Sequence, residues 1–402
     1  MTAPITAVDI ERAAAAICGH VVRTPLVPAP RLSAQYGCEV RLKLENLHNT
    51  GSFKDRGACY KLQQLKQEGV QGVVAASAGN HAQGVAWHAT RQDLPATIVM
   101  PLTTPFSKVE RTEAYGARVV LHGESVAEAQ DRAHEIAEME GFAFVPPYDD
   151  PQVIAGQGTC GREVLEDWPD VECVVAPIGG GGLLAGIAIW FEAHRPQARM
   201  FGVQTMGCPS MRAAVRGEEP GTLHTLTLAD GIAVKRPGKI TTPILARRCE
   251  DILLVGEAEI EHAVQTLASQ NKVVAEGGGA VPLAALAQDP TRFQGKKVCL
   301  VISGGNIDRR MLSTVLLRGL ARDGKVARLR IEIQDLPGVL SRVTRLIGDT
   351  GADIIDIDHQ RTFSHLPPRC AELQVVLETR GQTHVERILQ VLQREGFPAR
   401  AT

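Results

Sequence analysis

Short apolar runs alternate with longer amphipathic stretches over most of the chain, from about Val40 to Leu320. This alternation is typical of βαβ units, in which helices connect parallel strands. The buried strands that it predicts are Val73–Ala76, Thr97–Met100, Arg118–Leu121, Cys173–Ile178 and Val298–Ile302. The helices that it predicts between them are Ala82–Arg91, Lys108–Tyr115, Ser125–Glu140 and Leu183–Ala193. The predicted fold class is therefore α/β, with doubly wound parallel sheets.

The alternating region is longer than one hydrophobic core comfortably holds, so we expect two sheets with an active site between them. Near residues 321–325 the pattern changes to strand, helix, strand, strand, helix. The strands Ile354–Asp358 and Glu372–Glu378 alternate apolar and polar residues, which predicts a sheet with one face covered by helices. We therefore predict two domains, residues 1–322 and 326–402, joined by a short polar linker.

Composition narrows the possible partners. The 402 residues include 43 basic and 45 acidic ones, for a net charge of -2, so a small molecule is a more plausible partner than nucleic acid or a membrane. The nine cysteines form no C-x-x-C pair, which argues against a disulfide framework or a zinc site. With no signal-peptide pattern and no apolar run of about 20 residues, we expect a cytoplasmic location.

A lysine motif follows a strand, in the run E-N-L-H-N-T-G-S-F-K-D-R-G-A that begins at Glu45. Ser52 and Asp55 form an S-x-x-D capping pattern, which places Lys54 in the first turn of a helix. The partial positive charge of the helix end favours the neutral amine that a Schiff base requires. A lone lysine is more often a solvated side chain, so this motif does not decide the function by itself.

A second motif, S-A-G-N-H-A-Q-G, begins at Ser77 after the strand Val73–Ala76 and leads into a helix. Backbone N–H groups gather at such a turn and bind carboxylates. An ordinary turn that uses glycine and asparagine is an equally good interpretation of the motif alone. The polar residues Ser77, Asn80, His81 and Gln83 favour a binding site.

Two glycine motifs complete the set. The run G-G-G-G-L-L-A-G from Gly179 lies between a strand and a helix, which predicts a phosphate site rather than a flexible linker. It also matches the dinucleotide pattern G-x-G-x-x-A, but the acidic residue expected about 20 positions later is missing at Gln204 and Thr205, which argues against a nicotinamide enzyme. The motif S-G-G-N from Ser303 ends a buried strand, where a simple turn and a ligand site are both open.

These four motifs, in this order, resemble the threonine dehydratases of the tryptophan-synthase-β-like pyridoxal-phosphate family, over roughly residues 5 to 320. The resemblance implies a two-lobed fold-type-II enzyme, with a small lobe at about residues 50–150 inserted in a large lobe. It also implies the pyridoxal 5'-phosphate cofactor and conversion of L-threonine or L-serine to 2-oxobutanoate or pyruvate and ammonia.

The resemblance also implies roles for individual residues. Lys54 holds the cofactor as a Schiff base and removes the substrate Cα proton, Asn80 bonds the phenolic oxygen, and Ser303 faces the pyridine nitrogen. The full set of cofactor residues is Lys54, Phe53, Asn80, Gly179, Gly180, Gly181, Gly182, Leu183 and Ser303. The substrate is expected at Ser77, Ala78, Gly79, Asn80 and His81. Glu276 matches a family glutamate near the cofactor, or it simply completes a helix dipole.

Two departures from related enzymes narrow the activity. Serine racemases of this fold carry a second serine where this chain has Ala78, so we expect elimination rather than racemisation. The loop Gln204–Ser210 lacks the carboxylates with which some relatives bind a divalent cation, so we predict no metal site there. A serine racemase, a hydroxyaspartate ammonia-lyase and a non-catalytic amino-acid sensor remain the alternatives.

Residues 326–402 resemble the ACT ligand-binding domain. The turn Asp335–Val339 follows the first strand of this segment, and the resemblance implies an effector site lined by Asp335 and Gly338. We expect allosteric control by an amino acid, isoleucine or valine, in isoleucine biosynthesis, and a homo-oligomer, either a dimer or a tetramer. The alternative is a domain that serves only for dimerisation.

Overall fold

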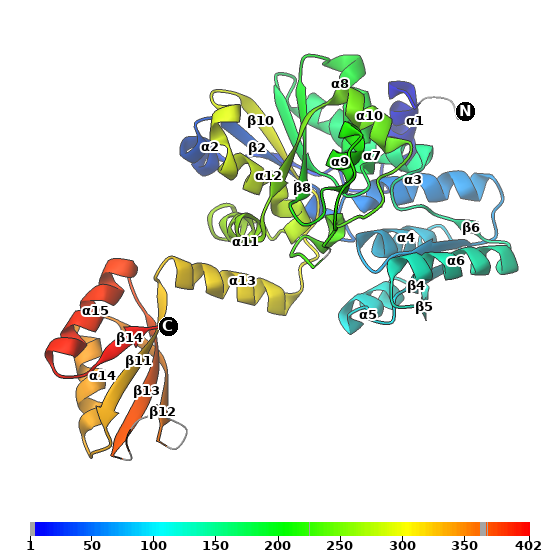
Figure 1. The fold of residues 1–402 in the computed structure, drawn as a ribbon. Coiled ribbons are helices and arrows are strands. Elements are labelled where there is room, and N and C mark those ends of the chain that lie inside the picture. The colour runs from blue at the N-terminus through cyan, green and yellow to red at the C-terminus, as the bar shows by residue number, and fades with distance from the viewer. Residues whose placement is uncertain (1–4, 225, 362–366, 368) are drawn as a thin grey trace. The chain divides into compact units, whose positions relative to one another are not determined.

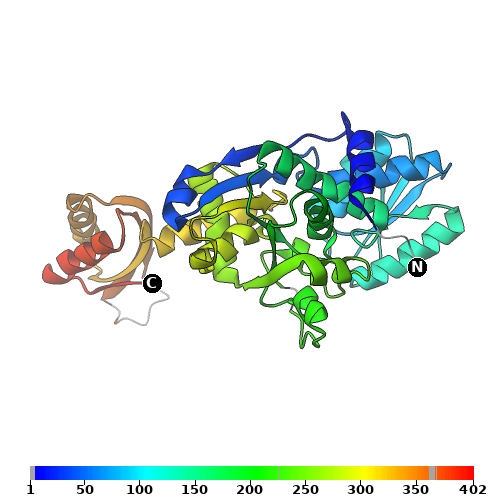
Figure 2. The ribbon, with the colours of Figure 1, turned by 90° about the horizontal axis from the view of Figure 1, so that it is seen from above.

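A computed structural model describes residues 5–224, 226–361, 367 and 369–402 of the chain. The chain forms two compact units that divide between Ile307 and Asp308. The first contains two largely parallel sheets and the second an antiparallel sheet (Figures 1 and 2), so the predicted fold class is confirmed. The predicted domains, 1–322 and 326–402, divide the chain after helix α13 (Arg309–Arg322), whereas the compact units divide before it. The predicted domain limits stay a prediction.

The larger sheet of the first unit has six strands in the order β1-β2-β10-β7-β8-β9. Their bounds are β1 Leu26–Pro28, β2 Glu39–Leu44, β10 Lys297–Ile302, β7 Cys173–Pro177, β8 Arg199–Thr205 and β9 Cys249–Val255. Only β1 is antiparallel to its neighbour. Every residue of β7 is buried, because helices cover both faces of such a sheet.

The smaller sheet has four parallel strands in the order β5-β4-β3-β6. Their bounds are β5 Arg118–Leu121, β4 Ala96–Met100, β3 Val73–Ala76 and β6 Ala143–Phe144. Helices α4 (Asn80–Thr90), α5 (Phe106–Ala114) and α6 (Val126–Glu140) connect these strands. All strands and helices predicted from the apolar pattern are present, with ends that differ by at most two residues.

The remaining helices of the first unit surround the larger sheet or join the two sheets (Figure 1). They are α1 Ala7–Ile17, α2 Pro30–Tyr36, α3 Lys54–Gln67, α7 Pro151–Asp167, α8 Gly182–His194, α9 Ser210–Arg216, α10 Thr241–Arg248, α11 Glu257–Thr266 and α12 Gly277–Gln288. Short helical turns are η1 Glu45–Leu47, η2 Asp230–Ile232, η3 Leu267–Asn271 and η4 Pro290–Phe293. Helix α8 is buried along Gly182–Phe191, as its continuous apolar sequence requires.

Helix α7 packs closely against both α3 and α8, because glycines remove side chains at the crossings. A Cβ on Gly156 would lie 2.7 Å from Gly57 Cα of α3. A Cβ on Gly186 of α8 would lie 2.5 Å from Ile154 O and 2.6 Å from Gly158 N of α7. These contacts bring the start of α3 and the start of α8 toward the same region.

A buried group of charges ties α3 to the rest of the first unit. Arg56 donates to both oxygens of Glu45 at 2.6 and 2.8 Å and to both oxygens of Glu163 at 2.7 Å. Lys43 of β2 donates to Glu163 at 2.5 Å and to Thr24 O at 2.6 Å. Burial alone would raise the pKa of Glu45, but the electrostatic attraction of Arg56 and His48 and the hydrogen bonds from both together outweigh burial and hold that pKa well below its usual range. All four of these side chains are therefore paired inside the protein.

The second unit contains α13 and a four-stranded antiparallel sheet in the order β12-β13-β11-β14. The strands are β11 Val326–Gln334, β12 Asp353–Gln360, β13 Cys370–Glu378 and β14 Ala399–Ala401. Helices α14 (Val339–Asp349) and α15 (Gln382–Arg394) cover one face of this sheet (Figure 1). Alternate residues of β13 are buried beneath them, as the alternating sequence predicts.

Among the residues that the structure describes, no helix combines the length and the apolar character needed to span a membrane.

We predict that Arg56→Met destabilises the first unit by about 3–5 kcal/mol, because Glu45 and Glu163 would lose their shared partner inside the protein. Urea unfolding followed by tryptophan fluorescence measures this change. The matched control is Arg132→Met, since Arg132 pairs with Glu135 on the exposed surface of α6. That control should change stability by less than about 0.5 kcal/mol. Equal stability of the two variants would show that the buried ions do not hold α3.

Candidate active site

Three of the four sequence motifs meet at the carboxyl end of β10, the edge at which α/β sheets bind ligands. Phe53 N–H donates to Ser303 O at 3.0 Å, and Ser52 forms an isolated antiparallel bridge with Gly304. The side-chain NH2 group of Asn306 donates to Asn80 Oδ1 at 2.8 Å. The lysine motif, the S-A-G-N-H motif and the S-G-G-N motif are thus in direct contact.

The segment that follows β6 connects Lys54 with the fourth motif, the glycine run. Lys54 Nζ donates to Pro147 O at 2.5 Å. The ring of the next residue, Tyr148, packs against the glycine run so closely that a Cβ on Gly180 would lie 2.3 Å from it. The structure therefore brings all four motifs to one region of the first unit.

Lys54 is the first residue of α3 and its amine forms no ion pair with any described carboxylate. Its Nζ lies 5.1 Å from the centre of the Phe53 ring. Burial lowers the pKa of Lys54 from 10.5 to about 8, because a buried ammonium loses its hydration. The neutral, nucleophilic fraction of the amine near neutral pH is therefore far larger than for an exposed lysine.

The predicted capping of α3 by Ser52 and Asp55 is wrong. Residue Phe53 precedes the helix without any side-chain cap, and the buried Ser52 hydroxyl has no partner among the described residues. Asp55 instead accepts hydrogen bonds from the backbone N–H and the hydroxyl of Thr50. The bridge between Ser52 and Gly304 explains the difference, since it holds Ser52 against the end of β10 rather than over the helix.

The glycine run forms a site suited to an anion. The backbone N–H groups of residues 179–183 have no hydrogen-bond acceptor in the described part of the chain, although residues 180–183 are buried. Gly181 has a φ of 97°, which side-chain-bearing residues rarely adopt, and Thr241 Oγ1 donates to Gly180 O at 2.6 Å. Unpaired N–H groups at the start of a helix are the usual partners of a phosphate.

The S-A-G-N-H motif presents backbone donors rather than the His81 side chain. His81 Nε2 lies 2.9 Å from Val145 O, which can only accept, so this nitrogen carries the proton. Burial, together with the nearby Lys54 charge, lowers the pKa of His81 to about 3, so the ring stays neutral. The N–H groups of Asn80, His81 and Ala82 begin α4 and have no backbone acceptor among the described residues. They are available to a carboxylate.

Glu276 and Ser303 complete the site. Asn80 donates to Glu276 Oε1 at 2.7 Å. Burial, followed by the charge of Asp230, raises the pKa of Glu276 to about 7, so both protonation states exist at neutral pH. Ser303 is buried, and its Oγ lies 3.5 Å from Gly278 O, which leaves the hydroxyl weakly bonded.

Several residues of this region were not predicted. Tyr148 and Thr241 shape the glycine run, and Lys108 and Arg111 of α5 form polar contacts with Asp230 and Asn306. Most of them lie outside the sequence motifs, so only the folded chain shows their proximity. Asn306 was visible as the last residue of S-G-G-N, but that motif did not indicate a role for its side chain. Within the described residues, no group of three or more metal-ligating side chains is assembled.

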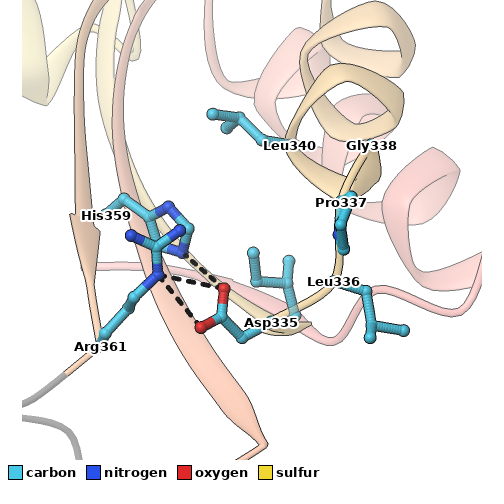
Figure 3. Close-up of a pocket in the computed structure, with 8 residues that line it drawn as sticks. Asp335, Leu336, Pro337, Gly338, Leu340, His359 and Arg361 are labelled. Atoms are coloured by element: carbon cyan, nitrogen blue, oxygen red, sulfur yellow. Dashed lines mark hydrogen bonds and ion pairs between the residues drawn. The ribbon is translucent and has the colours of Figure 1, made fainter.

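A separate pocket of about 340 Å³ lies in the second unit, between the β11–α14 turn and the end of β12 (Figure 3). Both residues predicted to line an effector site, Asp335 and Gly338, are among its walls. The Asp335 carboxylate accepts from Arg361 Nε at 3.1 Å through each oxygen and lies 3.9 Å from His359 Nε2. The apolar walls are Ile333, Leu336, Pro337 and Leu340.

Comparison with known proteins places this site in a family. Residues 17–304 match the pyridoxal-phosphate dependent enzyme family, and residues 327–397 match the ACT domain. The chain therefore belongs to the pyridoxal-phosphate-dependent enzymes and carries a C-terminal ACT domain. The Lys54 amine, whose pKa is lowered, suits the aldehyde of this cofactor. The N–H groups of the glycine run, which have no acceptor among the described residues, suit its phosphate. The residues present therefore fit the cofactor.

The names of individual relatives state particular activities within this family. The chain is 44% identical to an L-threonine ammonia-lyase of Thermotoga maritima, over 98% of this chain and 99% of the relative. It is 44% identical to the catabolic L-threonine dehydratase of Escherichia coli, over 78% of this chain and 96% of the relative. Among solved structures, the threonine deaminase of T.th. aligns with a TM-score of 0.70 and 38% identity, over 75% of this chain and 99% of that chain. Maize serine racemase aligns with a TM-score of 0.74 and 30% identity, over 80% and 99%.

We predict that attachment of pyridoxal phosphate to the cofactor-free protein accelerates about tenfold per pH unit below pH 8 and levels off above it. The reason is that only the neutral Lys54 amine reacts, and its pKa is about 8. Trapping with borohydride at short times, followed by peptide mapping, measures the rate at Lys54. Lys54→Ala identifies the peptide signal. A midpoint near 10.5 would show that burial does not lower this pKa.

Proposed function

We propose that this chain is an L-threonine ammonia-lyase regulated by an amino acid. It converts L-threonine to 2-oxobutanoate and ammonia, and L-serine to pyruvate and ammonia. The observation that carries the proposal is the partly neutral, buried Lys54 amine in the same region as the N–H groups of the glycine run, which have no acceptor among the described residues. The 44% identity to a threonine ammonia-lyase over almost the whole chain selects this activity among those of the family.

In this proposal the residues of the site divide the binding of the cofactor. Lys54 Nζ and Phe53 hold its aldehyde end, the N–H groups of residues 179–183 bind its phosphate, and Ser303 faces the ring nitrogen. Asn80 donates to the phenolic oxygen. When bound, the cofactor supplies an electron sink for the electrons of the substrate Cα–H bond. A hydroxyl such as that of Ser303 leaves the ring nitrogen unprotonated, which favours loss of a β-hydroxyl.

The substrate carboxylate is placed on the N–H groups at the start of α4, around Ser77, Ala78, Gly79, Asn80 and His81. This anchoring orients the Cα–H bond toward Lys54, whose neutral amine removes the proton. Water then leaves from Cβ, and the enamine product reacts with water to give the 2-oxo acid and ammonia. Glu276 contributes by holding the Asn80 amide in place.

Racemisation is the second candidate activity, because maize serine racemase and a pyridoxal-phosphate-dependent aspartate racemase share the fold at TM-scores of 0.74 and 0.72. Returning a proton to the opposite face of Cα requires an acid there. This chain has Ala78, whose methyl group has no acidic proton to donate, at the position where the serine of the racemases is expected. Elimination is therefore the proposed outcome.

We predict that Lys54→Ala lowers 2-oxo acid release from L-threonine by roughly a thousandfold or more, because one group both anchors the cofactor and moves the proton. Lys66→Ala, an exposed lysine in the last turn of the same helix, should leave the rate within about twofold. The assay uses L-threonine, L-serine and hydroxyaspartate as substrates and also measures D-isomers. Wild-type activity in Lys54→Ala, or D-isomer formation faster than 2-oxo acid release, would contradict the proposal.

For regulation, we propose that the pocket of the second unit binds isoleucine or valine. Asp335 complements the effector ammonium group, and Arg361 complements its carboxylate (Figure 3). Ile333, Leu336 and Leu340 offer an apolar wall to an aliphatic side chain. Gly338, with a φ of 87°, forms the turn that begins α14 beside the pocket. We further propose a homo-oligomer, a dimer or a tetramer, a role in isoleucine biosynthesis and a cytoplasmic location.

We predict that Arg361→Met weakens isoleucine or valine binding to the full-length protein by about tenfold or more, since it removes the carboxylate partner. Calorimetric titration measures the affinity. The matched control is Arg345→Met, an exposed arginine on α14 outside the pocket, which should bind as the wild type does. If none of the twenty amino acids binds or changes activity, the domain serves only for association between chains.

A further inference from the structure

Asn306 closes the S-G-G-N motif after β10, and no role described so far uses its side chain. The amide has three polar partners from three separate segments. Its Oδ1 accepts from Arg111 Nη1 of α5 at 2.9 Å. Its Nδ2 donates to Thr50 O, in the loop before Lys54, at 2.6 Å and to Asn80 Oδ1 at 2.8 Å.

Two of these partners fix the orientation of the amide. A guanidinium can only donate hydrogen bonds and a backbone carbonyl can only accept them. The amide oxygen of Asn306 must therefore face Arg111, and its NH2 group must face Thr50. Gly51 leaves room for this amide, because a Cβ at that position would lie only 2.7 Å from Asn306 Oδ1. The opposite orientation would oppose donor to donor at Arg111 and acceptor to acceptor at Thr50.

The fixed orientation passes on to Asn80. Because Asn80 Oδ1 accepts from Asn306, the Asn80 NH2 group must point the other way. One hydrogen of that group serves Glu276 Oε1 at 2.7 Å. The other has no acceptor in the described part of the chain, so it is available to an oxygen atom of a bound molecule.

We infer that Asn306 is a positioning residue, which sets the Asn80 amide so that its NH2 group faces the phenolic oxygen of the cofactor. This inference rests on the proposed function. Arg111 supports the arrangement from α5, so the small lobe takes part in it. Lys108, one turn earlier on the same helix, donates to Asp230 of η2 at 2.8 Å and holds α5 near the site.

The orientation has a chemical consequence. An NH2 group that donates to the phenolic oxygen stabilises its deprotonated form and lowers the pKa of the bound cofactor. The reversed amide would place an oxygen against that oxygen and favour the protonated form. A side chain that merely filled space at position 306 would not change this pKa.

The test compares cofactor-loaded, full-length Asn306→Asp with the wild type. The aspartate still accepts from Arg111, but it cannot donate to Thr50 O, and it draws the Asn80 NH2 group away from the cofactor. The dissociation constant of pyridoxal phosphate should rise roughly three- to tenfold. The pH midpoint of the cofactor absorption band should move to higher pH. Asn49→Asp, an exposed asparagine in the loop before Lys54, is the control for the added charge and should show neither change.

Variants of Arg111, an exposed residue, test the same inference and remain usable if Asn306→Asp does not fold. Arg111→Met should also move the pH midpoint of the cofactor absorption band to higher pH, but by less than Asn306→Asp does. Arg111→Lys keeps a hydrogen-bond donor, so its midpoint should lie closer to the wild-type value than that of Arg111→Met. If the absorption midpoint of folded Asn306→Asp equals that of the wild type, the inference about Asn306 is wrong, while the proposed function stands. If only Arg111→Met folds, an unchanged midpoint in that variant has the same meaning. A wild-type protein that binds no pyridoxal phosphate overturns the proposed function as well.

Discussion

The catalytic unit depends on the buried arginine that follows the reactive lysine by two residues. Arg56 holds one carboxylate from η1 and one from α7, and both are almost completely buried. Ions in such a place are tolerated only when every charge has a partner, so the geometry permits few alternatives. The start of α3 is thereby fixed to two other elements. Lys54 lies two residues earlier on the same helix, so its position is fixed too, with Pro147 O as its hydrogen-bond partner.

Much of the fold could be predicted because the burial pattern is local in sequence. Strands such as β7 and β3 are covered on both faces and therefore read as continuous apolar runs, and the strands of the second unit alternate because only one face is covered. Lys54 and the glycine run could be recognised for a similar reason, since each stands where a strand passes into a helix. The cap of α3 was predicted wrongly because a contact with Gly304, about 250 residues away, decides where Ser52 lies.

The remaining parts of the candidate site could not be predicted, because they come from segments without a periodic pattern. Tyr148 lies after β6 and Thr241 begins α10, and nothing in their surroundings indicates that both contact the glycine run. In the second unit, the turn containing Asp335 was found as the end of a strand. Its partner Arg361 stands just beyond β12 and carries no signal in the sequence. Contacts between distant segments set the chemistry of these residues, whereas neighbours along the chain set the fold.

The backbone N–H groups of the glycine run, which lack acceptors among the described residues, also link the stability of the protein to its cofactor. Buried N–H groups without acceptors cost free energy, and here several of them stand together at the start of a buried helix. A phosphate that occupies them binds the folded chain and not the unfolded one, so the folded population rises with the concentration of free cofactor. We expect a cell with little pyridoxal phosphate to lose this enzyme through faster turnover of the polypeptide as well as through idle active sites. Vitamin supply would then set the abundance of the protein.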